Sequence, residues 1–342
     1  MVTGRPRKRN PSGRLLLVLS VVASCTTVQT TVPPISQTIA STTTTVVDTA
    51  PPTPPATAAP SPSESPSPTL PMNADAVVTR TGVPVAVVEQ LPMGFLVTSP
   101  CGNPRTIRSG TPLGSIDVVV DPGHGGEPDP GAVGANGLSE SEINLRVSRE
   151  LASILTERGF SVALTRTADY TSPLAVRAAF ADHVGAEMMI SIHHNAPTAN
   201  LTSTPGTEVF IQHADPDSRR LGELAYGFVF DALSEFDGMT WSSAPDAGAI
   251  EVLNTRGMDA YGMLRTPATV TVLVELAYIS HWPEAELMTS SRYVEITAEA
   301  LADAAVAYLE TEETGRGYVA TPRVFNPQRG VSGSVCEDPL LD

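Results

Sequence analysis

Basic residues are scarce in this chain, which has 21 Lys and Arg against 37 Asp and Glu in 342 residues and a formal net charge of −16. Proteins that bind nucleic acid need clustered positive charge to neutralise phosphates, so we expect no nucleic-acid partner. The chain is 41% hydrophobic and 17% charged. This composition suffices for one full domain core plus appendages and excludes a wholly disordered protein.

The first basic residues of the chain precede a short apolar run, Leu15 to Val22. They are Arg5, Arg7, Lys8, Arg9 and Arg14. The run is too short to span a bilayer as a mature helix, and basic residues followed by such a run are typical of a signal peptide. We therefore predict that residues 1–24 are a signal peptide and that the protein is exported to the cell envelope.

Cysteine is also rare, with three residues in the whole chain. Cys25 ends the sequence Val-Ala-Ser-Cys, which resembles a bacterial lipobox, where the cysteine is lipidated and becomes the mature N-terminus. We predict a lipid anchor at Cys25 that holds the protein on the outer face of the cytoplasmic membrane; an ordinary signal peptide that ends near a cysteine is the alternative. Lipidation leaves Cys101 and Cys336, which we expect to pair as a disulfide in an oxidising compartment.

Three segments flank the main domain. Residues 25–71 are dominated by Thr, Ser, Pro, Ala and Val, a composition that predicts an extended, disordered tether. Residues 72–114 are rich in Val and broken by Gly and Pro, which predicts a small β-hairpin segment. This segment covers an edge of the main domain or, alternatively, acts as a wall-binding or regulatory module. Residues 312–342 form a C-terminal tail.

Residues 115–311 alternate short apolar runs with amphipathic stretches. The run 116–120 is continuously apolar, as expected for a strand buried on both faces. In the stretch 141–158 apolar residues recur at helical spacing, and Gly159 ends the pattern. Because strands alternate with helices, we predict an α/β domain with a mostly parallel sheet and helices on both faces.

Reactive side chains lie at the ends of these strands, the edge where α/β sheets bind ligands. His124 and His193 each follow a predicted strand. Glu275 lies near the end of another strand, and Glu140 lies at the start of the first long helix. Two histidines and a carboxylate suit a three-ligand zinc site with one position for water, whose pKa zinc lowers to about 7. A second carboxylate can then accept the proton of that water.

Some short motifs are missing. The chain has no HExxH zinc motif, and no GK[ST] or GxGxxG accompanies the glycines around His124. The absence of these last two motifs argues against a phosphate-binding loop.

Four motifs nevertheless occur in order between about residues 115 and 310: VVVDPGHGG, GLSE, SIHHNA and VLVELAYIS. Together they resemble the zinc-dependent N-acetylmuramoyl-L-alanine amidases of the amidase-3 family. The resemblance implies that the protein hydrolyses the amide bond between N-acetylmuramic acid and L-alanine in peptidoglycan, as cell-wall amidases and autolysins do. It also implies that His124, Glu140 and His193 bind Zn²⁺ and that Glu275 is the catalytic acid/base.

Some positions leave alternatives open. His194 and Asn195 follow the predicted ligand in SIHHNA, and we expect both to bind substrate, with a supporting position behind the metal as the alternative for His194. The segment before Glu140 is one residue longer than the usual motif, which makes Glu142 the nearest competitor as ligand. The rival functions are a zinc peptidase that cuts within the stem peptide and a catalytically silent wall-binding lipoprotein.

Overall fold

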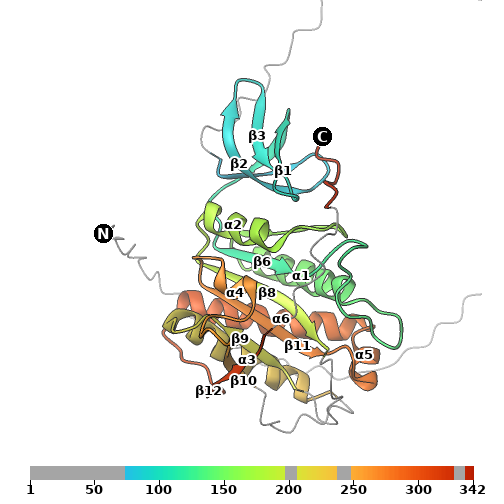
Figure 1. The fold of residues 1–342 in the computed structure, drawn as a ribbon, viewed down its shortest axis with the longest axis vertical. Coiled ribbons are helices and arrows are strands. Elements are labelled where there is room, and N and C mark those ends of the chain that lie inside the picture. Colours follow the sequence, from blue (N-terminus) through green and yellow to red (C-terminus); the bar gives the residue numbers. More distant parts are fainter. Residues whose placement is uncertain (1–73, 197–205, 237–247, 327–335) are drawn as a thin grey trace, which may run out of the picture. The chain divides into compact units, whose positions relative to one another are not determined.

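A computed structural model describes residues 74–196, 206–236, 248–326 and 336–342 of the chain (Figure 1). The predicted signal peptide, the predicted tether and Cys25 lie outside these residues. Among the described residues, no helix is both long enough and apolar enough to cross a membrane.

The expected β-rich segment precedes the main domain as a five-stranded sheet, larger than a hairpin. All its neighbouring strands are antiparallel, in the order β4-β3-β2-β1-β5. The strands are β1 (Ala76–Thr79), β2 (Pro84–Leu91), β3 (Gly94–Thr98), β4 (Pro104–Ile107) and β5 (Gly110–Leu113). Alternate residues such as Val85, Phe95 and Val97 are buried in a small core of their own, because successive side chains of a strand point to opposite faces.

The main domain is built on a seven-stranded sheet in the order β12-β10-β9-β11-β8-β6-β7. Its strands are β6 (Val118–Pro122), β7 (Val162–Leu164), β8 (Met188–Asn195), β9 (Glu208–Ile211), β10 (Gly248–Leu253), β11 (Thr271–Tyr278) and β12 (Tyr318–Val324). Five neighbouring pairs are parallel, but β9 and β11 are antiparallel, so the sheet is mixed. β9 therefore also runs opposite to β8, which pairs in parallel with β11.

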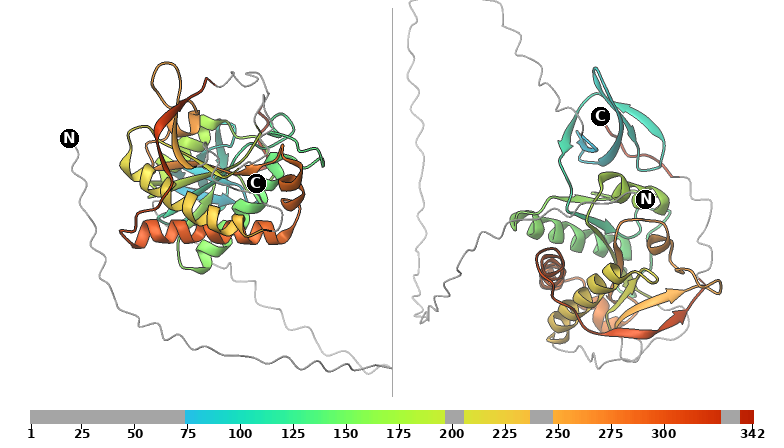
Figure 2. Two further views of the ribbon diagram at one scale, coloured as in Figure 1. Left: turned by 90° about the horizontal axis from the view of Figure 1, so that it is seen from below. Right: turned by 90° about the vertical axis from the view of Figure 1, so that its left-hand side faces the viewer.

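Helices cover both faces of this sheet (Figure 2). The helices are α1 (Glu140–Glu157), α2 (Leu174–Val184), α3 (Pro216–Ser234), α4 (Gly262–Arg265), α5 (Trp282–Leu287) and α6 (Ser291–Glu310). Alternation along β6 separates the two cores: Val118 and Val120 pack with α1, α3 and α6, whereas Val119 packs with α2 and α4. Side chains at the ends of the strands are therefore also directed to one face or the other.

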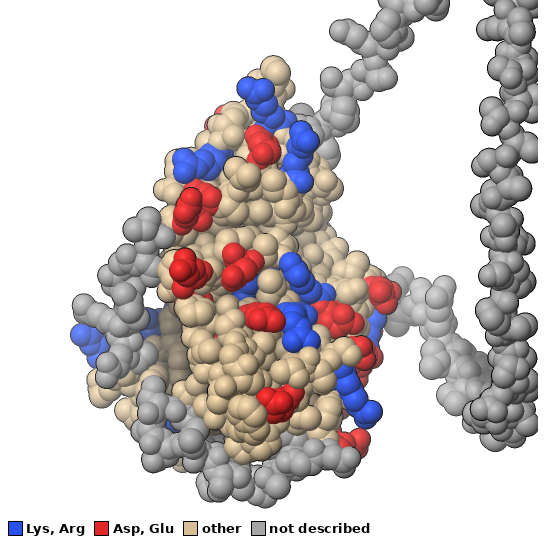
Figure 3. Space-filling view, turned by 90° about the vertical axis from the view of Figure 1, so that its right-hand side faces the viewer, with Lys and Arg blue, Asp and Glu red and all other residues tan. Residues whose placement is uncertain are grey.

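Charged side chains of both signs share the surface. On the face shown in Figure 3, Arg side chains lie among Asp and Glu. Ion pairs between elements include Arg158 at the end of α1, which pairs with Glu299 and Asp303 of α6. Exposed pairs of this kind contribute little stability individually, so the packed cores hold the domain together.

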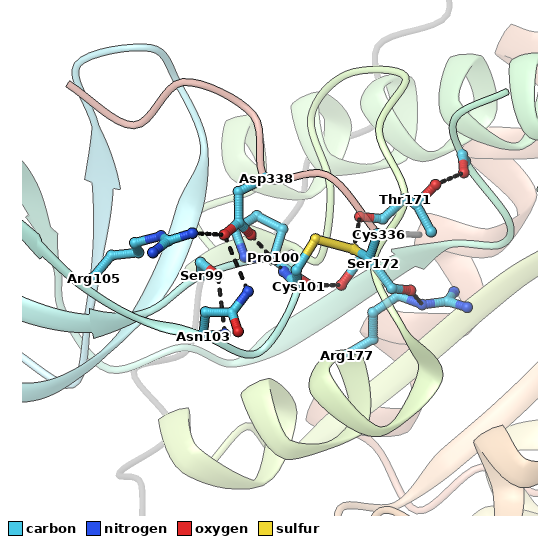
Figure 4. The surroundings of a disulfide bond; sticks show 11 residues. Ser99, Pro100, Cys101, Asn103, Arg105, Thr171, Ser172, Arg177, Cys336 and Asp338 are labelled. Atoms are coloured by element: carbon cyan, nitrogen blue, oxygen red, sulfur yellow. Dashed lines mark hydrogen bonds and ion pairs between the residues drawn. A yellow bond between two sulfur atoms is a disulfide. The ribbon is translucent and has the colours of Figure 1, made fainter. Parts of the chain in front are cut away.

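The end of the chain is fastened to the small sheet (Figure 4). Cys336 forms a disulfide with Cys101 across a sequence separation of 235 residues, which confirms the predicted pairing. Asp338 accepts hydrogen bonds from the backbone N–H of Cys101 and from Arg105, and Leu341 is buried in the core of the small sheet. In chain-entropy terms, closing so long a loop stabilises the fold by up to about 5 kcal/mol.

Candidate metal centre and active site

Three predicted ligands converge at the carboxyl edge of the main sheet. His124 follows β6, His193 lies near the end of β8, and Glu140 is the first residue of α1. Their donor atoms all lie within 4.8 Å of one another. Oε1 of Glu140 is 2.9 Å from Nδ1 of His193 and 3.3 Å from Nε2 of His124. The sheet and α1 fix the positions of all three groups.

The glycine-rich loop allows this close approach. A Cβ atom added at Gly123 would lie 2.3 Å from the imidazole of His193, and one added at Gly131 would lie 2.6 Å from Glu140 Oε2. Neither position has room for a side chain. His124 itself has φ of 61°, a left-handed backbone conformation that non-glycine residues adopt at a cost and that is concentrated at functional sites.

Two buried arginines, Arg166 and Arg177, stabilise the end of β6 and the start of the glycine-rich loop that follows it. Arg166 donates hydrogen bonds to the carbonyls of Pro122 and Gly123 and to that of Ser141, so it joins the loop to α1. Arg177 pairs with the fully buried Asp121. Burial opposes the charge of Asp121, but this arginine, with hydrogen bonds from side chains on neighbouring strands, lowers its pKa below the ordinary value. Sequence reasoning missed both arginines; Arg166 directly after a strand at the functional edge was the available signal.

The charges at the centre favour a bound cation. Burial opposes ionisation of Glu140, yet the two imidazoles outweigh it and hold its pKa well below the ordinary value. Burial also opposes a charge on His124, but hydrogen bonds to Asp129 and Glu140 raise its pKa to about 10. Burial lowers the pKa of His193 and so favours its neutral, metal-binding form. The Glu140 carboxylate therefore keeps a proton on the neighbouring His124 imidazole. A bound metal ion can take the place of that proton and supply the positive charge instead.

Asp129 orients one of these ligands. Its Oδ1 is 2.6 Å from Nδ1 of His124. Nδ1 then carries the proton as donor to the carboxylate, and Nε2 of His124 faces Glu140 with its lone pair available to a metal. The site therefore has both a candidate ligand set and a carboxylate that fixes the tautomer of one of its histidines.

Glu275 lies beside the ligand set on the neighbouring strand. It is in register with His193 across the parallel pair β11 and β8. Its side chain is buried, and its Oε2 has no hydrogen-bond partner among the described residues. Burial, followed by the charges of Glu140 and Glu208, raises the pKa of Glu275 well above the ordinary value. A buried carboxyl group with an unsatisfied oxygen is costly for stability, and such groups concentrate at functional sites.

Of the two residues after His193, His194 has a different position from the one expected. His194 points to the opposite face of β8, is 1% exposed, and hydrogen-bonds Asn144 at 2.7 Å and Tyr293 at 2.9 Å. Burial lowers its pKa to about 3, which keeps it neutral. The expectation that His194 binds substrate is therefore corrected: it supports β8 from behind because adjacent strand residues face opposite ways. Asn195 donates a hydrogen bond to Glu208 at 2.7 Å.

The fold distinguishes Glu140 from its competitor Glu142 as a candidate third ligand. Glu142, the competitor, is exposed on the first turn of α1, where its N–H donates to the capping oxygen of Ser139. Glu140, two residues earlier, points inward and is 5% exposed.

A cavity of about 520 Å³ opens beside the two histidines. His124, Asp129 and His193 line one part of it, and Tyr261 and Met263 line another. Cys336 of the disulfide also contributes to the wall, so the fastened tail borders the cavity. The centre combines two histidines and an ionised carboxylate with a second carboxyl group of raised pKa, and a cavity lies beside it. These are the groups that a metallohydrolase requires.

Comparison with known proteins identifies the family. Residues 118–307, more than half of the chain, match the Amidase_3 family, described as N-acetylmuramoyl-L-alanine amidase. The chain belongs to this family, which confirms the resemblance seen in the four motifs.

Named relatives agree with this assignment, and a solved structure shares the fold. The chain is 27% identical over 226 residues to N-acetylmuramoyl-L-alanine amidase AmiC of Neisseria meningitidis, covering 58% of this chain and 54% of that protein. It is 27% identical over 232 residues to AmiA of Escherichia coli, covering 60% and 79%. The crystal structure of an N-acetylmuramoyl-L-alanine amidase from Clostridium difficile 630 has the same fold, with a TM-score of 0.50 at 23% identity over 58% of this chain and 99% of that one.

The position of Asp129 generates a prediction about metal affinity. Asp129→Asn keeps the shape of the side chain but removes the charge that orients His124, and supporting carboxylates of this kind contribute about 10–100-fold to metal affinity. We expect the Kd for Zn²⁺ to rise by that factor in competition with a chromophoric chelator. Glu127→Gln, an exposed change on the same loop, is the control and should leave the Kd unchanged. Equal affinities of Asp129→Asn and the wild type would contradict the assigned role.

Proposed function

We propose that this protein is a zinc-dependent amidase that hydrolyses the bond between N-acetylmuramic acid and L-alanine in peptidoglycan. Four side chains carry the proposal: the donor atoms of His124, Glu140 and His193 within 4.8 Å of one another, and Glu275 beside them with an unpartnered carboxyl oxygen. Membership of the amidase family supports this bond as the target.

Zinc is the metal that best suits the ligands. Two imidazoles and one carboxylate are a usual catalytic zinc set, and three protein ligands leave a coordination position open. His124, Glu140 and His193 would hold the ion, and Asp129 would orient His124. When bound, zinc would supply Lewis-acid polarisation of a carbonyl and a lowered pKa for water.

Glu275 is the proton carrier in this mechanism. As water attacks the carbonyl carbon of the lactyl group, Oε2 of Glu275 accepts the proton that the water releases. Glu275 then donates this proton to the nitrogen of L-alanine as the C–N bond breaks, which returns the carboxylate to its starting state. The products are a free carboxylic acid on the muramic acid and a free amino group on L-alanine. The raised pKa of Glu275 suits both steps, because the group must gain and then lose a proton near neutral pH.

Two rival functions differ from this proposal in ways that can be measured. A zinc peptidase would use the same chemistry on another bond, within the stem peptide. A silent wall-binding protein would have no need for the buried, unpartnered carboxyl of Glu275, which destabilises the fold without a catalytic role. The amidase reading accounts for both the ligand set and this cost.

Glu275→Gln and His124→Ala separate proton transfer from metal binding. Glu275→Gln should keep one zinc per chain but lower the rate of peptidoglycan digestion by about 10²–10⁴-fold, because the amide cannot accept the proton. His124→Ala should lose the zinc itself, since two remaining ligands hold it poorly. Zinc content and digestion rate are measured on the same preparations, with the exposed Glu142→Gln as a control that changes neither. A Glu275→Gln protein that digests peptidoglycan at the wild-type rate would refute the mechanism, and one without zinc would make Glu275 a ligand.

Export and lipid anchoring complete the proposal. A cell-wall substrate requires an enzyme in the envelope, and the family supports this location. The basic residues, the apolar run and the Val-Ala-Ser-Cys order before residue 26 support a signal peptide of residues 1–24 and a lipid on Cys25.

The anchor is tested by fractionation. The Cys25→Ala protein should leave the membrane fraction, because a signal peptide alone gives no permanent attachment after cleavage. A Cys25→Ala protein that stays with the membranes after a high-salt wash would show that something other than this cysteine holds it there.

A further inference from the structure

The last strand of the main sheet lies beyond the part of the chain that matches the family. The match ends at residue 307, whereas β12 spans Tyr318–Val324 and pairs in parallel with β10 at the edge of the sheet (Figure 1). Arg323 of this strand reaches past β10 and forms an ion pair with Glu208 of β9. The chain's own C-terminal strand thus places a positive charge against the buried Glu208.

Glu208 is buried and joins the two strands that carry the centre. Its side chain is 2% exposed. Oε2 of Glu208 accepts a hydrogen bond from Nδ2 of Asn195 at 2.7 Å and one from the hydroxyl of Tyr278 at 3.3 Å. Asn195 ends β8, two residues after His193, and Tyr278 ends β11, three residues after Glu275. One carboxylate therefore holds the ends of both strands.

Glu208 also lies directly across from Glu275. The two residues are partners in the antiparallel register of β9 and β11. Side chains at opposed positions of an antiparallel pair lie on the same face about 5 Å apart, and like charges there repel. Arg323 reduces this repulsion because its guanidinium pairs with the carboxylate of Glu208. Without that cation a buried negative charge would face the proposed proton carrier, and burying an uncompensated charge is strongly unfavourable.

We propose that Arg323 is a positioning residue for the reaction: it holds the Glu208 carboxylate in place, and Glu208 in turn fixes the ends of β8 and β11 and the orientation of Glu275. This inference rests on the proposed function, in which Glu275 transfers the proton. Arg323 acts through Glu208 and takes no part in the chemistry itself.

The first test is Arg323→Gln, assayed on a soluble muramoyl-peptide fragment. We expect kcat to fall about 10–100-fold, the usual effect of removing a supporting charge, with KM within about twofold of the wild type. Zinc content should stay at one per chain, since Arg323 is not one of the three proposed ligands. Arg316→Gln is the matched control: it lies just before β12 and pairs with the exposed Asp231, so its kcat should equal that of the wild type.

A double-mutant cycle tests whether Arg323 acts through Glu208. Gln at position 208 keeps an oxygen that can accept from Asn195 and Tyr278 but carries no charge that needs a cation. In the Glu208→Gln background, Arg323→Gln should therefore change kcat by less than about threefold, because contacting residues that form one unit are not additive. Arg323→Lys, which retains the charge, should recover most of the activity lost in Arg323→Gln.

The outcomes are distinct. An Arg323→Gln enzyme with wild-type kcat overturns the inference, and so does an equal loss of kcat in the two Glu208 backgrounds. If Arg323→Gln fails to fold, the double variant Arg323→Gln/Glu208→Gln still tests the inference, because it has no uncompensated buried charge at position 208. The inference requires its kcat to match that of Glu208→Gln alone. A wild-type chain that releases no product at all would refute the proposed function instead.

Discussion

The centre depends on the contacts that the buried carboxylate of Glu140 makes with two imidazoles. An ionised group at this depth is unfavourable unless positive charge lies against it, and the imidazoles of His124 and His193 supply either a proton or the lone pairs that bind a cation. The left-handed backbone of His124 and the bare Cα positions around it follow from the need to bring these groups together.

A second constraint separates the two carboxyl groups at the centre. The pKa of Glu140 is lowered by its imidazole neighbours, whereas that of Glu275 is raised by burial and by neighbouring negative charge. Two acids whose environments push their pKa values apart take different roles, one as a permanent anion and one as a proton carrier. The fold produces this difference because α1 places Glu140 between the histidines, whereas β11 carries Glu275 beside them.

Much of this centre could be predicted from the sequence because the proposed ligands lie in short motifs at the ends of apolar runs. The strand–loop pattern and the motifs were sufficient to predict four residues of this centre: His124, Glu140, His193 and Glu275. Other features depend on pairings between distant strands, which one sequence does not reveal. The reversed direction of β9 and the ion pair between Arg323 and Glu208 are of this kind. The inward direction of His194 follows from strand alternation, but only once the extent of β8 is known.

The identity of the cleaved bond tests the account most directly. Purified peptidoglycan is digested with the zinc-loaded protein, with and without a chelator, and the products are identified by mass spectrometry and amino-terminal labelling. The account predicts new L-alanine amino termini, glycan strands left intact, and no release in the presence of the chelator. Products in which L-alanine remains joined to muramic acid and the cut lies within the stem peptide would contradict it.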